Sequence, residues 1–229
     1  MKILLLNIGN THTQVAESDG SEIRIVASLD TAELTASQLP PADAVALASV
    51  VPAATERLAE LHPFVLHRDH AAACGVSLAQ VDASTLGMDR LANAIELAQK
   101  CPAGAVLDCG TAITLEVLGE GGVFLGGAIA PGRKLMRRSL SSGTAQLPEL
   151  ALTADAPEKL GINTATSMYF GIDRGAVGMV REWLSFLKGI PVYCIGGDAP
   201  FFLQALPELQ EGGALFTLNG LLRAYLCNR

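Results

Sequence analysis

An apolar run near the start of the chain, LLLNIGNT at residues 4–11, ends in a polar residue, a glycine and a threonine. Residues 105–111, AVLDCGT, repeat this order about one hundred positions later. Each run is followed by a second strand-like segment, at residues 13–16 and 113–118, and then by a turn at glycine. This order is typical of a β-hairpin. Two copies predict two similar α/β domains, although a strand followed by glycine also recurs by chance in α/β proteins.

The rest of the chain alternates between strand and helix patterns. Buried strands are expected at residues 44–51, 64–66 and 191–195. Helices are expected from Pro52 through Glu60, then at Met88–Gln99, Arg133–Leu140, Thr164–Lys188 and Asn219–Cys227. The sequence CPAG at residues 101–104 ends the second of these helices. It predicts an N-terminal domain of residues 1–103 and a C-terminal domain of residues 104–229.

Composition narrows the class of protein. Half of the 229 residues are hydrophobic and 17% are charged, which is enough for a packed core and excludes a disordered chain. The net charge of −7 argues against broad nucleic-acid binding, which rests on cationic contacts to phosphate. No apolar stretch approaches about 18 residues, so no membrane span is expected. Five cysteines without a CxxC pair fit a reducing cytoplasm.

Three glycine turns could bind phosphate or a nucleotide. A glycine after a strand lets a phosphate approach backbone N–H groups, a following threonine adds a donor, and a carboxylate can hold Mg²⁺ through water. Asp108, Gly110 and Thr111 supply all three parts, whereas the turn after Asn7 lacks the carboxylate. The glycine pair at 196–197 could lie against adenine or ribose. Each turn is equally compatible with a purely structural role.

Other charged or metal-binding patterns are weaker. The basic residues after Gly132 are expected to form a solvated helix face rather than a phosphate site; they are Arg133, Lys134, Arg137 and Arg138. The spacing of His67, His70 and Cys74 matches no standard zinc pattern, so ordinary packing is expected there.

A carboxylate and a guanidinium stand side by side at a predicted helix start, at Asp89 and Arg90. An aspartate in this place commonly caps the helix. The alternative is a general base next to an anion-binding arginine. Local sequence leaves both interpretations open.

Taken in order, these segments resemble the type III pantothenate kinase family, of the acetate-kinase/sugar-kinase/Hsp70/actin superfamily. The family's GxDRxxN is matched in full by residues 87–93, and its late glycine pair by residues 196–197. DxGNT is matched by residues 7–11 except at the first position, and DxGTAxTxD by residues 108–116 except at the last. Three further patterns, GGxIxPG, LxxxTAxLP and GxNT, are matched by residues 126–132, 140–148 and 161–164.

The resemblance implies an α/β fold of two duplicated actin-like (ribonuclease H-like) domains with mixed sheets and a nucleotide cleft between them. It implies transfer of the γ-phosphoryl group of ATP to pantothenate, giving 4′-phosphopantothenate for coenzyme A, by a cytoplasmic homodimer that uses Mg²⁺. Asp89 would be the catalytic base, Asp108 would hold a monovalent cation (K⁺ or NH₄⁺), and Thr111 would bind ATP. Pantothenate would contact Gly87, Met88, Asp89, Arg90 and Thr164. The remaining ATP contacts would be Asn7, Ile8, Gly9, Asn10, Thr11, His12, Thr13 and Gln14.

Two residues depart from the family pattern. Asn7 stands where the family has aspartate, which removes a charge near the expected Mg²⁺. Glu116 also replaces an aspartate but keeps the charge, and it is expected to reach further toward the metal. An active kinase is favoured by Asp89, Arg90 and Thr164. Asn7 favours the alternative of a weakly active or non-catalytic relative that acts as a nucleotide-binding or regulatory accessory protein. Another phosphotransferase or phosphohydrolase of the superfamily is the third interpretation.

Overall fold

The computed structural model describes residues 1–187 and 189–229, which contain two five-stranded sheets. The first sheet has the strand order β3-β2-β1-β4-β5. Its strands are β1 (Ile3–Ile8), β2 (His12–Ser18), β3 (Ile23–Asp30), β4 (Ala44–Ser49) and β5 (Phe64–Val65). The central strand β1 pairs antiparallel with β2 and parallel with β4, so the sheet is mixed, as expected.

The second sheet has the order β10-β9-β6-β7-β8. Its strands are β6 (Gly104–Cys109), β7 (Ala112–Gly119), β8 (Val123–Pro131), β9 (Val192–Ile195) and β10 (Gln210–Glu211). Both predicted hairpins are confirmed, and in each turn the glycine N–H donates a hydrogen bond to a carbonyl further along the turn. The N–H of Gly9 donates to the carbonyl of His12 at 3.1 Å, and that of Gly110 to the carbonyl of Ala112 at 3.0 Å.

The helices agree with the prediction at their starts more than at their ends. They are α1 (Pro52–Arg57), α2 (Met88–Lys100), α3 (Arg133–Gly143), α4 (Thr164–Tyr169), α5 (Gly175–Ser185), α6 (Ala199–Ala205) and α7 (Phe216–Cys227). The single helix predicted from Thr164 to Lys188 is interrupted by a π-helical turn at Phe170–Arg174 and ends at Ser185; Lys188 lies outside the described residues. None of the helices in the described part of the chain is long and apolar enough to cross a membrane.

The chain divides into two compact units. Unit 1 comprises residues 1–104, 116–126 and 214–229, and unit 2 comprises residues 105–115 and 127–213. Because α7 belongs to unit 1, this unit is assembled from segments that are far apart in the sequence.

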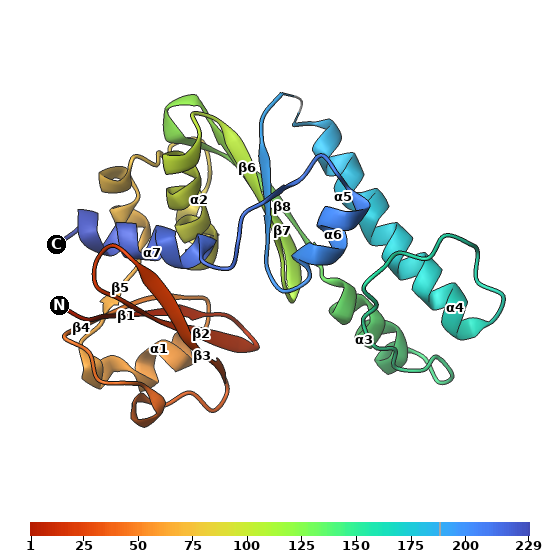
Figure 1. Ribbon diagram of the computed structural model, residues 1–229, viewed down its shortest axis with the longest axis horizontal. Coiled ribbons are helices and arrows are strands. Elements are labelled where there is room, and N and C mark those ends of the chain that lie inside the picture. The colour runs from red at the N-terminus through yellow and green to blue at the C-terminus, as the bar shows by residue number, and fades with distance from the viewer. Residues whose placement is uncertain (188) are drawn as a thin grey trace. The chain divides into compact units, whose positions relative to one another are not determined.

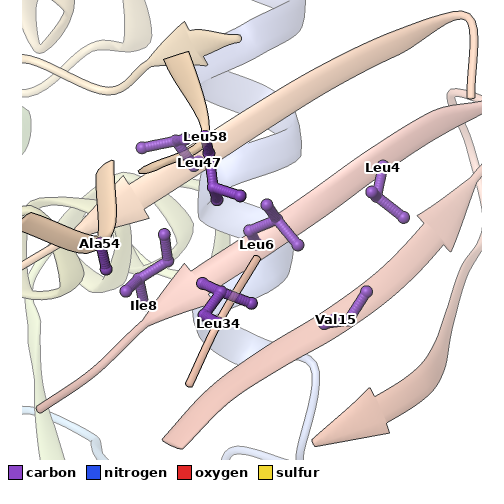
Figure 2. Packing of buried hydrophobic residues seen from close by; sticks show 8 residues of the cluster. All are labelled: Leu4, Leu6, Ile8, Val15, Leu34, Leu47, Ala54 and Leu58. Carbon is purple, nitrogen blue, oxygen red and sulfur yellow. The ribbon is translucent and has the colours of Figure 1, made fainter. Parts of the chain in front are cut away.

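Both faces of β1 are buried in unit 1. Leu4, Leu6 and Ile8 lie on one face of the strand and pack with Leu47 of β4 and with Ala54 of α1, as Figure 2 shows. The opposite face, which carries Leu5, is covered by α7, and α7 packs along α2 (Figure 1). The two helices touch at Gly220 of α7, where a Cβ atom would collide with the carbonyl of Ala92. This close approach fixes α2, and with it the residues at its N-terminus.

Candidate active site

The turn between β1 and β2 presents three exposed residues, Asn10, Thr11 and His12, at the carboxyl end of β1. The side chains of Ile8 and Thr13 point the other way. Ile8 lies in the hydrophobic core, and the hydroxyl of Thr13 is buried 2.9 Å from that of Thr31. Ile8 and Thr13 can therefore meet a ligand only through their backbone atoms.

Asn7 shares the β1 face of Leu5, which is the face toward α7, because side chains alternate along a strand. Its Oδ1 atom is buried and has no hydrogen-bond partner among the described residues. A buried acceptor without a donor costs free energy, so such an atom calls for an explanation, and a bound ion is one.

Asp89 lies in the first turn of α2, two residues after the helix's N-cap, Gly87. Its Oδ1 accepts a hydrogen bond from the N–H of Arg90 at 2.7 Å. A Cβ atom on Gly87 would lie 2.6 Å from that oxygen and 3.4 Å from the side chain of Val50, which directly follows β4. The N–H of Val50 donates to the carbonyl of Ile8 at 3.1 Å. Asp89 and the β1–β2 turn therefore stand at the same edge of the sheet, and the cap position belongs to Gly87 rather than to Asp89.

The surroundings of Asp89 alter its acidity. Burial raises the pKa of the carboxyl group above its usual value, against the opposing effects of the Arg90 N–H and the Arg90 charge. A carboxylate with a raised pKa is a better proton acceptor, because its basicity lies nearer the working pH. A buried carboxylate with a raised pKa is a candidate for catalysis.

Arg90 is held by an ion pair with Glu116, a partner that the sequence did not predict. Its Nε donates to Oε1 of Glu116 at 2.8 Å, and the Glu116 side chain has no exposed surface. The expectation that Glu116 reaches toward a metal is therefore corrected, because its carboxylate is committed to Arg90 inside unit 1. Asn93 donates to Glu116 Oε2 at 3.4 Å and accepts from Thr217 of α7 at 2.8 Å. This chain of side chains links the start of α2 to β7 and α7.

Unit 2 brings two of the predicted glycine turns, at residues 108–111 and 196–197, together with Gly132 around the β6–β7 turn, whereas the predicted turn after Asn7 belongs to unit 1. The N–H of Gly132 donates to the carbonyl of Thr111 at 2.9 Å, and a Cβ there would collide with the carbonyl of Gly110. Gly196 has φ +92°, and a Cβ on it would lie 2.6 Å from Oδ1 of Asp108. We call Gly110, Gly132 and Gly196 the glycine cradle. The missing side chains of Gly132 and Gly196 allow these two segments of the chain to approach the backbone of the β6–β7 turn closely.

The basic residues of α3 correct the prediction of a solvated face. Lys134 and Arg138 are exposed as expected, but the side chains of Arg133 and Arg137 are each only 1% exposed. They pair with carboxylates far along the chain, which buried charges require. The partners are Asp173, shared by both arginines, and Asp198, reached by Arg133. Burial lowers the pKa of Arg133, but Asp198 and Asp173 outweigh it and raise the pKa overall.

The remaining predicted residues are placed as follows. Met88 is buried at the start of α2, so its side chain serves as an apolar wall. Thr164 is exposed at the first position of α4, where Asn163 caps the helix by accepting from the N–H of Thr166 at 2.9 Å. Thr164 belongs to unit 2, whereas Met88 belongs to unit 1. Among the described residues, no three His, Cys, Asp or Glu side chains form a group that could hold a metal ion by themselves.

Comparisons with known proteins show which family and which fold this chain resembles. Residues 3–185 match the model of the type III pantothenate kinase family. A type III pantothenate kinase from Caulobacter vibrioides is 29% identical over 258 aligned residues, which cover 100% of this chain and 98% of the relative. The crystal structure of a putative Baf family transcriptional activator from Campylobacter jejuni is similar with a TM-score of 0.71 and 18% identity, covering 98% of each chain. The apo ParM protein of pSK41 has a TM-score of 0.50 at 9% identity, covering 97% of this chain and 96% of its own, which is a likeness of fold alone.

Proposed function

Because the chain belongs to the type III pantothenate kinase family, we propose that it transfers the γ-phosphoryl group of ATP to the primary hydroxyl of pantothenate. The products are 4′-phosphopantothenate and ADP, and the reaction is the first step of coenzyme A biosynthesis. The family match over residues 3–185 carries this proposal. The position of Asp89 beside the β1–β2 turn supports it, because base and phosphate loop must work within one site.

Asp89 acts as the base. Its carboxylate accepts the proton of the pantothenate hydroxyl, and the oxygen forms a bond to the γ-phosphorus of ATP. The bond from that phosphorus to the β–γ bridging oxygen breaks, and ADP leaves with the bond's electrons. Phosphoryl transfer depends mainly on positioning and on charge neutralisation, so the raised pKa of Asp89 is an aid rather than the whole of catalysis.

We assign the two substrates to the residues as follows. Gly87, Met88, Asp89 and Arg90 contact pantothenate, together with Thr164, and Glu116 holds the guanidinium of Arg90 in place. The β1–β2 turn and Thr111 bind the phosphates of ATP. Ile8 and Thr13 contribute backbone groups only, since their side chains are buried.

The oxygen atoms of the chain fit a magnesium ion. Mg²⁺ in kinases is usually held by one or two protein oxygens together with substrate phosphates and water, so a complete protein cage is unnecessary. Asn7 offers a buried carbonyl oxygen without a protein partner among the described residues. When bound, the ion neutralises charge on the phosphates. Asp108, at the end of β6, is the proposed ligand of a monovalent cation, K⁺ or NH₄⁺.

The proposal also covers the domain boundaries, the oligomeric state and the cellular location of the protein. We infer domains of residues 1–103 and 104–229, and a cytoplasmic homodimer. The net charge of −7 supports small-molecule substrates rather than nucleic acid as the main ligands.

The test is the formation of 4′-phosphopantothenate from pantothenate and Mg²⁺–ATP, with and without K⁺, measured by mass spectrometry. Asp89→Asn serves as the matched control for contaminating activity. Product formed by the wild type, dependent on K⁺ and lost in the variant, supports the kinase. ATP binding without product would favour the alternative suggested by Asn7, a non-catalytic nucleotide-binding or regulatory relative.

A further inference from the structure

Arg133 connects two segments of the glycine cradle, one that contains Gly132 and one that contains Gly196. Its backbone follows Gly132 directly, and the N–H of Gly132 donates to the carbonyl of Thr111 at 2.9 Å. Its side chain reaches Asp198, the residue after the glycine pair, and the N–H of Asp198 donates to the carbonyl of Cys109 at 2.9 Å. The segments at Gly132 and at Asp198 therefore both donate hydrogen bonds to the β6–β7 turn. Arg133 links these two segments, through its peptide bond to Gly132 and its ion pair with Asp198.

The side-chain half of this link has the geometry of a rigid clamp. Nε of Arg133 lies 2.7 Å from Oδ2 of Asp198, and Nη2 lies 2.6 Å from Oδ1, so the two planar groups are joined by two parallel hydrogen bonds. Nη1 donates to Asp173 at 3.0 Å, and the guanidinium carbon lies 3.3 Å from the ring centre of Phe201. With contacts in so many directions and 1% exposure, the Arg133 side chain has one available position.

We propose that Arg133 is a positioning residue that holds the Gly196–Asp198 turn against the Asp108–Thr111 turn and so sets the width of the glycine cradle for the nucleotide. This inference rests on the proposed function, because it assigns the cradle to ATP. A change in cradle width alters ATP binding selectively, since pantothenate is assigned to residues outside the cradle. A displacement of about 1 Å at such a site can cost up to a hundredfold in efficiency.

Arg137 provides a matched control within the same cluster. It lies one helical turn after Arg133 on α3, is equally buried, and pairs with the same Asp173 at 2.7 Å. Within the described part of the chain, its side chain contacts Asp173, the Arg133 carbonyl and the ring of Tyr169, none of which is part of the cradle. Removal of either arginine leaves a buried carboxylate short of a partner, so both variants should lose stability.

The experiment compares KM values for ATP and pantothenate in Arg133→Gln and Arg137→Gln. For Arg133→Gln we expect KM for ATP to rise by about tenfold, with KM for pantothenate within about twofold of the wild type. For Arg137→Gln we expect a lower melting temperature but an unchanged KM for ATP. KM does not depend on the fraction of folded enzyme, so partial unfolding cannot imitate the result. Equal KM values for ATP in both variants and the wild type would overturn the inference.

Two further variants keep the inference testable if Arg133→Gln does not fold. Arg133→Lys retains one charge but loses the two-bond fork, and it should give a KM for ATP between those of the wild type and Asp198→Asn. The double variant Arg133→Lys/Asp198→Asn should be no worse than Asp198→Asn, because both changes break the same link. Additive effects in this pair would contradict the clamp.

Direct calorimetric titration with Mg²⁺–ATP separates this inference from the proposed function. If the wild type binds ATP but forms no 4′-phosphopantothenate, the kinase assignment fails, and weaker binding by Arg133→Gln would still support the clamp. If the wild type forms product and Arg133→Gln binds ATP as tightly as the wild type, the clamp fails alone.

Discussion

The substitution Asn7→Asp tests whether the buried oxygen at the end of β1 faces the metal. Without ligand, the new carboxylate would be buried where the Asn7 oxygen has no partner among the described residues. Such a group is destabilising by about 1–3 kcal/mol. With Mg²⁺ bound at about 4 Å and an effective dielectric near 20, the added attraction is on the order of 4 kcal/mol, and less through a bridging water. Half of that, about 2 kcal/mol, exceeds the 1.4 kcal/mol that corresponds to a tenfold change.

We therefore expect opposite effects in the free and the liganded protein. Asn7→Asp should melt at a lower temperature than the wild type without ligand, and should gain more from Mg²⁺–ATP, since ligand binding stabilises the folded state. Initial rates measured against Mg²⁺ concentration should give a lower half-maximal concentration and a rate about tenfold higher. Asn7→Ala, which removes the oxygen without adding charge, is the control and should show neither gain. If Asn7→Asp behaves like Asn7→Ala in the Mg²⁺ titration, the oxygen does not face the metal.

Three further outcomes follow from the site and its support. Asp89→Asn should lower turnover by about a hundredfold. The same substitution should raise the melting temperature at pH 7, because burial sets the pKa of Asp89 higher in the folded than in the unfolded state. The wild type therefore loses stability as the pH rises through the folded-state pKa. At a pH of about 3, which lies below the unfolded-state pKa, the difference in stability between variant and wild type should vanish. Glu116→Gln should raise KM for pantothenate and lower the urea-derived stability by about 2 kcal/mol, because it leaves the largely buried Arg90 without a counter-charge; an unchanged KM would show that Arg90 does not touch pantothenate. Gly220→Ala should destabilise unit 1 by about 1–3 kcal/mol, whereas Gly178→Ala in α5, where the added methyl meets open space, should stabilise the protein by up to about 1 kcal/mol; equal melting curves would contradict the close helix contact.

The local features of the fold were predictable from sequence because their signals are local. A strand, a glycine and a second strand are adjacent along the chain, and both hairpins formed where this order occurred. The helical spacing of apolar residues after Gly87 likewise placed α2 correctly. Strand β8 was missed because its glycines and Pro131 are typical of a loop. An edge strand tolerates both, since one side of its backbone needs no partner strand.

The charges inside the molecule were not predictable in the same way. Arg133 and Arg137 carry the helical spacing of an exposed basic face, and only contact with Asp173 and Asp198, at least 36 residues away, reverses that interpretation. The partner of Glu116 was hidden for the same reason, since 26 residues separate it from Arg90. Sequence periodicity reports which face a residue lies on, but it does not report what covers that face.

The division of unit 1 among distant segments has a consequence for how the protein is made. Helix α7 supplies part of the apolar cover of β1, and its Thr217 donates a hydrogen bond to Asn93, yet α7 is translated only after all of unit 2. While the ribosome synthesises residues 105–213, the first sheet is present with its α7-facing side uncovered, and exposed apolar strands are prone to aggregate. Unit 2 can finish folding before unit 1, so the part of the chain that is made first is completed last. If translation ended before α7, the shortened protein would have one face of β1 uncovered.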